Sequence, residues 1–555
     1  MKKTISPRVG ADRYEAARAG FAWRVPRTFN IGHACSDAQP PTALALVEPA
    51  PDGGERRLTF GDVSQLSNRM ANAFSGVFGI GAGARVAVIL PQRWETAVAH
   101  LAIYKLGAIA VPMSVLFKEE ALRHRLGDSG ARLIVTDRER LDLVASLTES
   151  GVHAAVATVD GHAGDPVADL GALMTAASAE FAAAATAPTD PALLIYTSGT
   201  TGAPKGALHA HRSLLGHLPG FEYSHDLFPQ TGDCFWTPAD WAWIGGLMDA
   251  LLPSWYHGRP VVSAARRKFD PEWAADVVVR YGVRNAFVPP TALRMMAAAD
   301  VALPPGTLRT LGTGGEVLGA ATLAWAAESL GVTVNEFYGQ TEANYIVGNS
   351  HTLWPVRPGS MGRPYPGHVV AVCREDGTAA EPGEPGEICV RTPDPVAFLE
   401  YWNAPEATEA KHRGRWLRTG DLARTDDDGY LWFEARVDDV ISSAGYRIGP
   451  EEIEACLRRH PSVALAAAIG VDDPIRGQAV KAFVQTAEGV EPSEQLADEL
   501  RELVRSKLAA YEYPKDVEFV PEIPLTVTGK IRRAELRARE AAAPAAQAAP
   551  ADASP

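Results

Sequence analysis

Short apolar segments alternate with helix-like segments along much of the chain. Apolar runs occur at Val86–Leu90, Ala108–Pro112 and Arg132–Thr136, and a helical stretch lies around Trp94–Leu106. Short buried strands that alternate with amphipathic helices are typical of layered α/β proteins. The 555 residues are also too many for one ordinary hydrophobic core. The sequence therefore predicts an α/β protein of two or more domains.

The pattern changes twice toward the C-terminus. After Gly359 the expected strands become short and are separated by Gly and Pro, which predicts a small β subdomain. From about Val437 a compact α+β unit is expected. We predict a large N-terminal domain over residues 1–437, a small mobile domain over 438–540, and a disordered Ala- and Pro-rich tail over 541–555. The other segments expected as strands are Gly258–Ala264, Asn285–Pro289, Leu308–Gly312, Val332–Phe337, Val369–Cys373, Glu387–Arg391, Tyr430–Phe433, Val463–Val471, Val480–Gln485 and Val517–Val520, and those expected as helices are Pro450–Arg459 and Gln495–Leu508.

Charge and cysteine content exclude several classes of function. The net charge is −14, so nucleic-acid binding is not expected, because phosphate backbones require a clustered positive field. The five cysteines are scattered without a CxxC pair, which argues against a disulfide framework and a structural zinc site. The first twenty residues contain no apolar run typical of a signal peptide, and no segment reaches the ~20 apolar residues of a membrane span. We therefore expect a cytoplasmic protein.

A phosphate-binding loop is predicted after the apolar strand Ala192–Ile195. The segment reads Tyr196-Thr-Ser-Gly-Thr-Thr-Gly-Ala-Pro-Lys-Gly206. Glycines let backbone N–H groups approach a polyphosphate, hydroxyls donate to its oxygens, and lysine supplies positive charge. The alternative is a polar surface loop without a ligand. The candidate ligand-binding residues are Thr197, Ser198, Gly199, Thr200, Thr201, Gly202 and Lys205.

Two better-known nucleotide motifs do not fit this chain. A P-loop counted from Gly199 needs glycine at position 204, where Pro204 stands, and Ser or Thr after Lys205, where Gly206 stands. A dinucleotide fingerprint is suggested by residues 79–84, but these precede the strand-like run at Val86 instead of following it. Kinase-like and dehydrogenase functions therefore lose their main support.

The loop and the motifs that follow it resemble the adenylate-forming superfamily over about residues 20–540. The segment Trp236–Gly246 and the motif spacing are most similar to the acetyl-like and medium-chain acyl-CoA synthetase branch. The resemblance implies a ligase that uses ATP, Mg²⁺ and CoA to form an acyl-adenylate and then an acyl-CoA thioester, releasing pyrophosphate and AMP. Two alternatives remain open, namely transfer to a carrier-protein pantetheine and a non-catalytic nucleotide-binding protein of this fold.

The predicted nucleotide site combines several of these motifs. The resemblance implies that Tyr338 stacks on adenine, Thr341 contacts the α-phosphate, and Glu342 holds Mg²⁺, for which a carboxylate is a suitable ligand. Asp421 is expected to accept hydrogen bonds from the ribose hydroxyls, with Arg436 beside it. The remaining residues assigned to ATP are Gly315, Glu316, Val317, Glu336, Phe337, Gly339, Gln340 and Arg447.

The C-terminal motifs imply the catalytic lysine, the hinge and the CoA channel. Lys530 would bridge the acyl carboxylate and the α-phosphate, neutralising charge during attack, and its context also resembles a regulatory acetylation site. Asp438 matches the hinge, and Ala444 and Gly445 match the pantetheine tunnel. His211 matches a position near the acyl carboxylate, although a packed histidine is the alternative. A metal role for His209 and His211 is not expected, because no third ligand has suitable spacing.

Three glycines are expected to enlarge the acyl pocket. At the positions of Gly339, Gly314 and Gly245, acetate-activating relatives carry Trp, Val and Thr, so side-chain volume is expected to be missing here. Trp243 and Ile244 keep the neighbourhood apolar. We therefore expect a medium-chain aliphatic or aromatic acid instead of acetate. Amino-acid selection is not expected, because we identify no aspartate in the pocket that would bind an amine.

Overall fold

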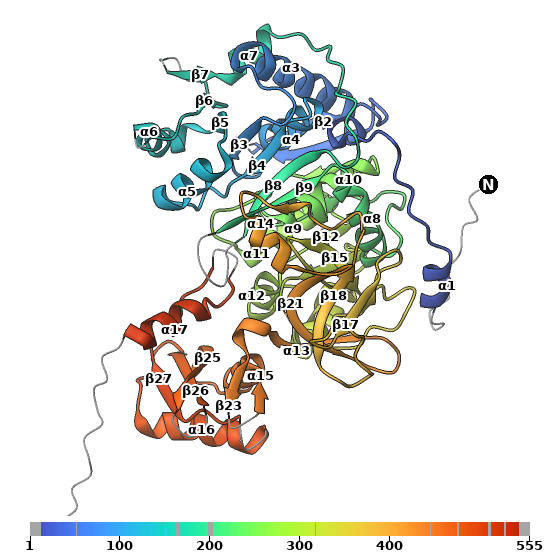
Figure 1. Ribbon diagram of the computed structural model, residues 1–555. Coiled ribbons are helices and arrows are strands. Elements are labelled where there is room, and N and C mark those ends of the chain that lie inside the picture. Colours follow the sequence, from blue (N-terminus) through green and yellow to red (C-terminus); the bar gives the residue numbers. More distant parts are fainter. Residues whose placement is uncertain are drawn as a thin grey trace, which may run out of the picture.

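The computed structural model describes residues 13–50, 53–149, 151–161, 164, 166–197, 204–316, 318–443, 446–473, 477–508, 512–526 and 529–542. Its strands form four sheets, two of them large. Figure 1 shows the chain running from the blue and green elements of the large sheets, through the orange strands, to a separate red unit at the C-terminal end. The predicted α/β fold class is confirmed.

One large sheet has eight strands in the order β19-β9-β8-β4-β3-β5-β6-β7. Strands β3 to β7 run parallel, whereas β8 and β9 form an antiparallel pair on either side of the predicted phosphate loop. The apolar runs at Val86, Ala108 and Arg132 thus become the adjacent buried strands β3, β4 and β5. The bounds are β3 (Arg85–Ile89), β4 (Ile109–Pro112), β5 (Leu133–Thr136), β6 (Ala155–Thr158), β7 (Val167–Asp169), β8 (Pro191–Thr197), β9 (Lys205–Ala210) and β19 (Glu400–Tyr401).

The other large sheet has nine strands in the order β16-β15-β14-β13-β12-β10-β11-β1-β2. Strand β14 is longer than expected, because it continues through Tyr338 to Gln340 before turning back into β15. The strand expected over Gly258–Ala264 is reduced to two residues. The bounds are β1 (Leu44–Pro49), β2 (Glu55–Thr59), β10 (Phe235–Trp236), β11 (Val261–Val262), β12 (Asn285–Phe287), β13 (Thr310–Gly314), β14 (Val334–Gln340), β15 (Ala343–Gly348) and β16 (Arg363–Pro364).

Helices cover both large sheets, and several are buried between them. Helix α4 has buried residues on all sides, as expected for a helix enclosed by other elements. Its Lys105 is fully buried, and its ammonium group donates to Asp37, Ser67 and Asn68 at 2.6, 2.9 and 2.7 Å. The helices of this part of the chain are α1 (Tyr14–Ala19), α2 (Ile31–Ala34), α3 (Phe60–Phe78), α4 (Trp94–Lys105), α5 (Glu119–Ser129), α6 (Leu141–Glu149), α7 (Leu170–Ala176), α8 (Ser213–Ser224), α9 (Ile244–Gly246), α10 (Leu252–Tyr256), α11 (Pro271–Arg280), α12 (Pro290–Ala298), α13 (Ala320–Trp325) and α14 (Pro405–Ala410).

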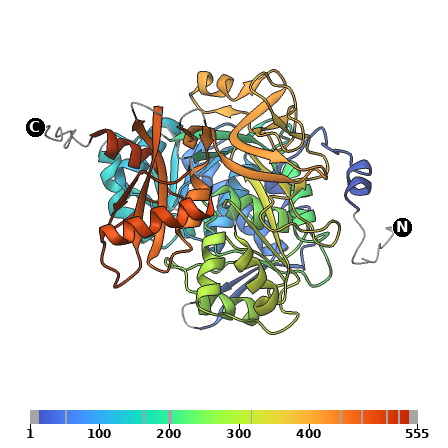
Figure 2. The same ribbon diagram turned by 90° about the horizontal axis from the view of Figure 1, so that it is seen from below.

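A smaller sheet and a C-terminal α+β unit complete the fold. Figure 2 shows the orange strands of the smaller sheet and the red C-terminal unit on different sides of the molecule. Helix α17 continues to Ala542 and thus includes the first two residues of the segment predicted as a tail, and residues 543–555 lie outside the described residues. The bounds are β17 (Val370–Cys373), β18 (Gly386–Arg391), β20 (His412–Arg413), β21 (Trp416–Thr425) and β22 (Leu431–Arg436), then β23 (Ile441–Ser443), β24 (Tyr446–Ile448), α15 (Pro450–Leu457), β25 (Val463–Asp473), β26 (Gly477–Thr486), α16 (Glu494–Lys507), β27 (Asp516–Phe519) and α17 (Arg533–Ala542).

A buried ion cluster attaches α17 to the start of the C-terminal unit. The Arg533 guanidinium donates to both carboxylate oxygens of Glu454, at 3.0 and 2.7 Å, and to Asp439 at 3.0 Å. Arg537 donates to the other oxygen of Asp439 at 3.0 Å. Arg533, Asp439 and Glu454 are all buried. Because Lys530 lies three residues before Arg533, this cluster also determines where the Lys530 loop is attached.

Replacing Arg533 with methionine is expected to loosen α17. Removal of Arg533 leaves Glu454 buried without its cation and Asp439 with Arg537 alone, which costs roughly 3 kcal/mol. The measurement is the opening free energy of α17 by hydrogen exchange. Arg539→Met on the same helix is the control, because Arg539 is half-exposed and forms an ion pair with the partly exposed Glu535. Equal effects of the two substitutions would contradict a structural role for the cluster.

Candidate functional site

Asp421 connects three separately predicted nucleotide residues. Its Oδ2 accepts hydrogen bonds from the Tyr338 hydroxyl at 2.6 Å and from Gln340 Nε2 at 2.5 Å. Its Oδ1 lies 3.2 Å from Arg436 Nη1, and the two residues face each other across β21 and β22. Burial, followed by the nearby Asp421 carboxylate, raises the pKa of Tyr338 well above its usual value, so its hydroxyl remains a donor. Strands β14, β21 and β22 thus bring together hydrogen-bonding groups that are suited to a ribose and an adenine.

Glu342 lies beside a second cluster that includes a residue missed by the sequence analysis. Its carboxylate accepts a hydrogen bond from the Tyr401 hydroxyl, and the Lys205 ammonium lies 5.6 Å from the centre of the Tyr401 ring. Burial, followed by the charge of Glu342, raises the pKa of Tyr401. No sequence motif marks Tyr401, which is 59 residues from Glu342 and reaches it through β19.

The surroundings of Glu342 are compatible with a magnesium ion shared with phosphate. No group of three His, Cys, Asp or Glu side chains in the described part of the chain could hold a metal by itself. Mg²⁺ in nucleotide sites needs only one or two carboxylates, because phosphate oxygens and water complete its shell. Glu342 fits this role, since Tyr401 bonds one of its oxygens and Lys205 lies nearby.

The phosphate loop is only partly described. Thr197 ends β8 and Lys205 begins β9, and the two residues face each other in the antiparallel pair. Ser198, Gly199, Thr200, Thr201 and Gly202 lie outside the described residues, as do Val317, Ala444 and Gly445. The two described residues that flank the loop, Thr197 and Lys205, therefore lie side by side at one end of β8 and β9.

The predicted adenine-side loop follows β13. Gly315 has φ +103°, a backbone conformation that L side chains rarely adopt. Glu316 accepts a hydrogen bond from Arg294 at 2.5 Å. In the adjacent β14, Glu336 accepts a hydrogen bond from the Leu318 amide at 3.1 Å, and burial raises its pKa to about 7. The other oxygen of Glu336 is buried without a partner among the described residues.

The loop that carries Lys530 contacts this adenine-side loop. Lys530 and Thr526 form a turn, with hydrogen bonds from the Lys530 amide to Thr526 Oγ1 at 3.0 Å and from the Thr526 amide to the Lys530 carbonyl at 2.7 Å. A Cβ built on Gly529 would lie 3.4 Å from Thr291 Oγ1 and 3.9 Å from Glu316 Oε1. Gly529, beside Lys530, therefore lies against α12, which contains Thr291.

Asp438 and Arg447, the other two described candidates in the C-terminal unit, lie close to the point where this unit joins the large domain. Asp438 is the middle residue of the 3₁₀ turn Val437–Asp439, which connects β22 to the C-terminal unit. Arg447 lies in β24, paired with Ser442 in β23. Asp438, the residue predicted as the hinge, therefore lies in a short turn between β22 and β23.

His211 does not join these clusters. It follows the end of β9 opposite Lys205, and six residues of extended strand span about 20 Å. Its ring is fully buried, Nδ1 accepts a hydrogen bond from the Ile31 amide at 3.2 Å, and burial lowers its pKa to about 4. These contacts give His211 a packing role, and its expected contact with the acyl carboxylate stays a prediction.

The three glycines of the expected acyl pocket do not leave empty space. A Cβ at Gly314 would lie 2.7 Å from the Phe337 ring, and one at Gly245 would lie 3.0 Å from the Phe287 ring. At Gly339 it would lie 2.5 Å from the backbone nitrogen of Tyr345. The expectation of missing volume is therefore wrong, since two glycines accommodate aromatic rings and the third allows close approach of β15. Trp243 contacts Phe117 edge-to-face at 5.7 Å, and Ile244 packs against the core.

Gly339→Ala is expected to lower both stability and activity. The added methyl group would meet the backbone of β15, which cannot rotate away as a side chain could. Overpacking of this kind costs roughly 1–3 kcal/mol. Urea unfolding is the measurement, with Gly127→Ala in α5 as the control, because a Cβ at Gly127 meets nothing within 4 Å. Unchanged stability of the Gly339 variant would show that β14 and β15 separate easily.

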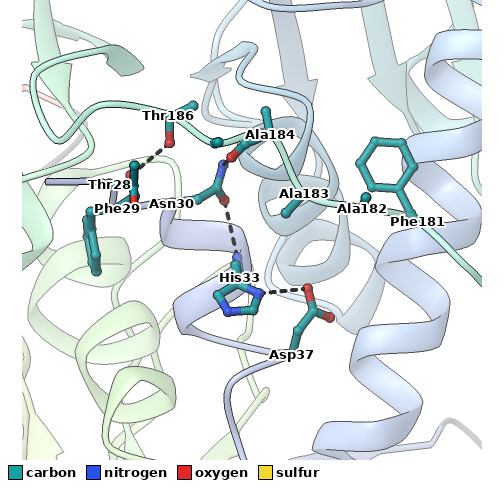
Figure 3. A pocket seen from close by; sticks show the side chains of 11 residues that line it. Thr28, Phe29, Asn30, His33, Asp37, Phe181, Ala182, Ala183, Ala184 and Thr186 are labelled. Atoms are coloured by element: carbon teal, nitrogen blue, oxygen red, sulfur yellow. Dashed lines mark hydrogen bonds and ion pairs between the residues drawn. The ribbon is translucent and has the colours of Figure 1, made fainter. Parts of the chain in front are cut away.

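A cavity of about 440 Å³ lies away from these clusters, at a strap between α7 and β8 (Figure 3). In it, His33 faces Asp37 at 3.5 Å and Asn30 donates to the Ala184 carbonyl at 3.2 Å. None of its lining residues belongs to the predicted site. They are Thr28, Phe29, Asn30, His33, Asp37 and the six residues Phe181–Thr186.

Comparison with known protein families shows the family to which the chain belongs. The sequence model of the family described as AMP-binding enzyme matches residues 34–402, and that of the AMP-binding enzyme C-terminal domain matches residues 452–530. The chain belongs to the AMP-binding enzyme family. The first match contains the β8–β9 turn and the Glu342 cluster, and the second ends at Lys530. The resemblance stated from the motifs is confirmed.

Relatives of this AMP-binding enzyme cover nearly its whole length. The mitochondrial acyl-coenzyme A synthetase ACSM3 of Rattus norvegicus is 33% identical, over 95% of this chain and 93% of its own. The acetyl-coenzyme A synthetase of Bacillus subtilis is 32% identical, over 88% of this chain and 86% of its own.

Solved structures agree with these relatives. The acyl-CoA synthetase of Brucella canis has a TM-score of 0.74 and 34% identity, covering 96% of this chain and 99% of its own. An anthranilate CoA ligase in complex with anthranoyl-AMP has a TM-score of 0.81 and 29% identity, covering 93% and 98%. This AMP-binding enzyme is therefore an AMP-forming acid–CoA ligase. No helix in the described part of the chain is long and apolar enough to cross a membrane.

Proposed function

We propose that this AMP-binding enzyme activates a medium-chain aliphatic or aromatic acid with ATP and Mg²⁺ and transfers the acyl group to CoA. The observation that supports this most strongly is the convergence of Tyr338, Gln340 and Arg436 on Asp421. The loop that carries Lys530 lies against Glu316 of the predicted adenine-side loop, which also supports the proposal.

Each side chain has a distinct role in the proposed reaction. Asp421 would exchange its bonds to Tyr338 and Gln340 for bonds to the ribose hydroxyls, and it would keep its ion pair with Arg436. Glu342 would hold Mg²⁺, which offsets phosphate charge when bound. Lys530 would neutralise charge as a carboxylate oxygen of the acid attacks the α-phosphorus and pyrophosphate leaves. The CoA sulfur then attacks the acyl carbonyl, and AMP leaves.

The proposed preference for a larger acid depends on apolar side chains near the three glycines and not on missing side-chain volume. We propose that Trp243, Ile244, Phe287 and Phe337 form an apolar wall for the acyl group, because the Phe287 and Phe337 ring centres lie 5.5 Å apart, Phe287 lies beside Gly245, and Trp243 and Ile244 directly precede that glycine. Such a wall favours an apolar chain or ring over a two-carbon acid. Its relatives include acyl-coenzyme A synthetases named ACSM3 and ACSM4, and the similar structures include an anthranilate CoA ligase and a benzoate CoA ligase. Both groups support the proposed range of acids.

A pyrophosphate-release screen tests this proposal. The acids are the straight-chain series from C2 to C16 and the benzoates, each with CoA, with a pantetheinylated carrier protein, and without an acceptor. We expect multiple turnovers only with CoA, and higher kcat/KM for C6–C10 or aryl acids than for acetate. Turnover only with the carrier protein would contradict the acceptor, and a preference for acetate would contradict the substrate class.

Two further properties are proposed for the same enzyme. Lys530 is exposed, so it is accessible to acetylation, which would remove the charge that adenylation requires. A cytoplasmic location is proposed from the five free cysteines, which suit a reducing compartment. Incubation with an acetyl donor followed by mass spectrometry of the Lys530 peptide tests the first property.

A further inference from the structure

Asp249 is a buried carboxyl group that the proposed reaction does not use. It lies in the π-helical turn Leu247–Leu251, which joins α9 to α10. Its side chain is buried, although aspartate is rarely buried without a partner cation. Single π-helical turns insert one extra residue into a helix and occur frequently at functional sites. The burial of Asp249 and its place in a π-helical turn both indicate a functional role.

The two carboxyl oxygens of Asp249 have different surroundings. Oδ1 accepts a hydrogen bond from Asn344 Nδ2 at 2.6 Å. Oδ2 lies 3.6 Å from the Cβ position of Gly245 and has no hydrogen-bond partner among the described residues. The same Cβ position lies 3.0 Å from the Phe287 ring. Oδ2 thus lies at the apolar wall proposed to bind the acyl group.

The protonation state of Asp249 follows from this environment. Burial raises its pKa well above the usual value, and only the Asn344 hydrogen bond opposes that shift. No lysine or arginine in the described part of the chain pairs with it. Burial without a partner cation therefore favours the protonated, neutral form of this carboxyl group. Because Oδ1 accepts from Asn344, the proton belongs on Oδ2, which becomes an O–H donor without an acceptor.

A purely structural role explains only half of this arrangement. Asn344 lies against Gly339, so its bond to Asp249 ties the π-helical turn to the β14–β15 hairpin. That link requires Oδ1 alone. A buried polar group without a partner costs roughly 1–3 kcal/mol, which a leucine at this position would avoid. The free Oδ2 is the observation that points to a ligand.

We propose that Asp249 is a specificity-determining residue that donates a hydrogen bond from Oδ2 to a hydroxyl or keto oxygen carried by the acyl group. This inference rests on the proposed function and narrows its substrate class to oxygen-substituted acids. A site with a buried donor discriminates strongly against an analogue that lacks the acceptor, because the donor is then left unpaired. An unsubstituted chain would satisfy the apolar wall but not Asp249.

Matched pairs of acids test the inference by their ratios of kcat/KM. The pairs are hexanoate with hexanoates hydroxylated at each carbon, and benzoate with its 2-, 3- and 4-hydroxy derivatives. We expect at least one hydroxy acid to exceed its parent by about tenfold, which corresponds to one hydrogen bond of ~1.4 kcal/mol. Asp249→Leu should remove or reverse that preference. Asp249→Asn should retain most of it, since an amide still donates.

Controls separate the role of Asp249 from damage to the helix. Met248→Leu changes a buried neighbour in the same turn with little change in volume, and its ratios should match the wild type. Asp249→Ala repeats the test should the leucine variant fail to fold.

Three results would overturn the inference. They are equal ratios in the wild type and Asp249→Leu, no preference for any hydroxy acid, or a preference for aminoalkyl acids that Asp249→Asn abolishes, which would indicate a charged aspartate. Failure of the wild type to adenylate every acid would instead refute the proposed function itself.

Discussion

Replacing Lys530 with alanine is expected to abolish acyl-adenylate formation while sparing thioester formation from a pre-made adenylate. The Lys530 loop lies against Glu316 and Thr291, beside the predicted adenine-side loop, and we expect its ammonium group to reach the α-phosphate of a nucleotide bound there. Loss of one charge-stabilising donor in such a site reduces the rate by about 100- to 1,000-fold. The second half-reaction has no such requirement, because the α-phosphate has already lost pyrophosphate.

The two half-reactions are measured separately for this variant. Pyrophosphate release in a single turnover reports adenylation, and CoA consumption with a synthetic acyl-adenylate reports thioester formation. Lys515→Ala is the control, because Lys515 is a half-exposed lysine of the same unit that pairs with Asp473. Equal losses in both half-reactions would refute the role assigned to Lys530.

Asp438→Pro is expected to have the opposite effect. Asp438 occupies the middle of the 3₁₀ turn Val437–Asp439, where backbone φ is typically near −60°. Proline restricts φ to about −65°, so it should fit the present orientation and oppose rotation to another one. Adenylation should persist, since the Lys530 loop already lies against Glu316. CoA-dependent turnover should fall by about tenfold or more, equivalent to ~1.4 kcal/mol.

The hinge assignment depends on a contrast between two variants. Asp438→Ala removes the side chain but leaves the backbone free to rotate, so it should affect CoA-dependent turnover far less than proline. Both half-reactions are measured as for Lys530. Full turnover by the proline variant would place the pivot elsewhere, and equal loss in the alanine variant would assign the effect to the carboxylate instead of the backbone.

Local patterns in the sequence were sufficient to predict most elements and the nucleotide motifs. Strands β3, β4 and β5 were recognisable because a buried parallel strand is a short apolar run whatever its neighbours are. The β14 motif was recognisable because polar side chains directly follow an apolar strand at a sheet edge. Such strands and motifs depend on a few consecutive residues, so they can be predicted without knowing any contact with distant parts of the chain.

Other features depend on residues far apart in the chain, and only the tertiary structure decided them. Whether a glycine creates space or accommodates a neighbour depends on that neighbour, and Phe337 and Phe287 fill the positions beside Gly314 and Gly245. The hydrogen bond from the Ile31 amide to the His211 ring joins residues 180 positions apart, so no local pattern could reveal it.

Two side-chain contacts near the proposed site also join residues that are far apart in the sequence. Asp249 meets Asn344 across 95 residues, and Tyr401 meets Glu342 across 59. The sequence by itself determined which segments form strands, helices and motif loops, because local side-chain pattern controls these. The tertiary structure decided which of the resulting side chains share a buried space, since burial and hydrogen bonding are properties of the packed neighbours.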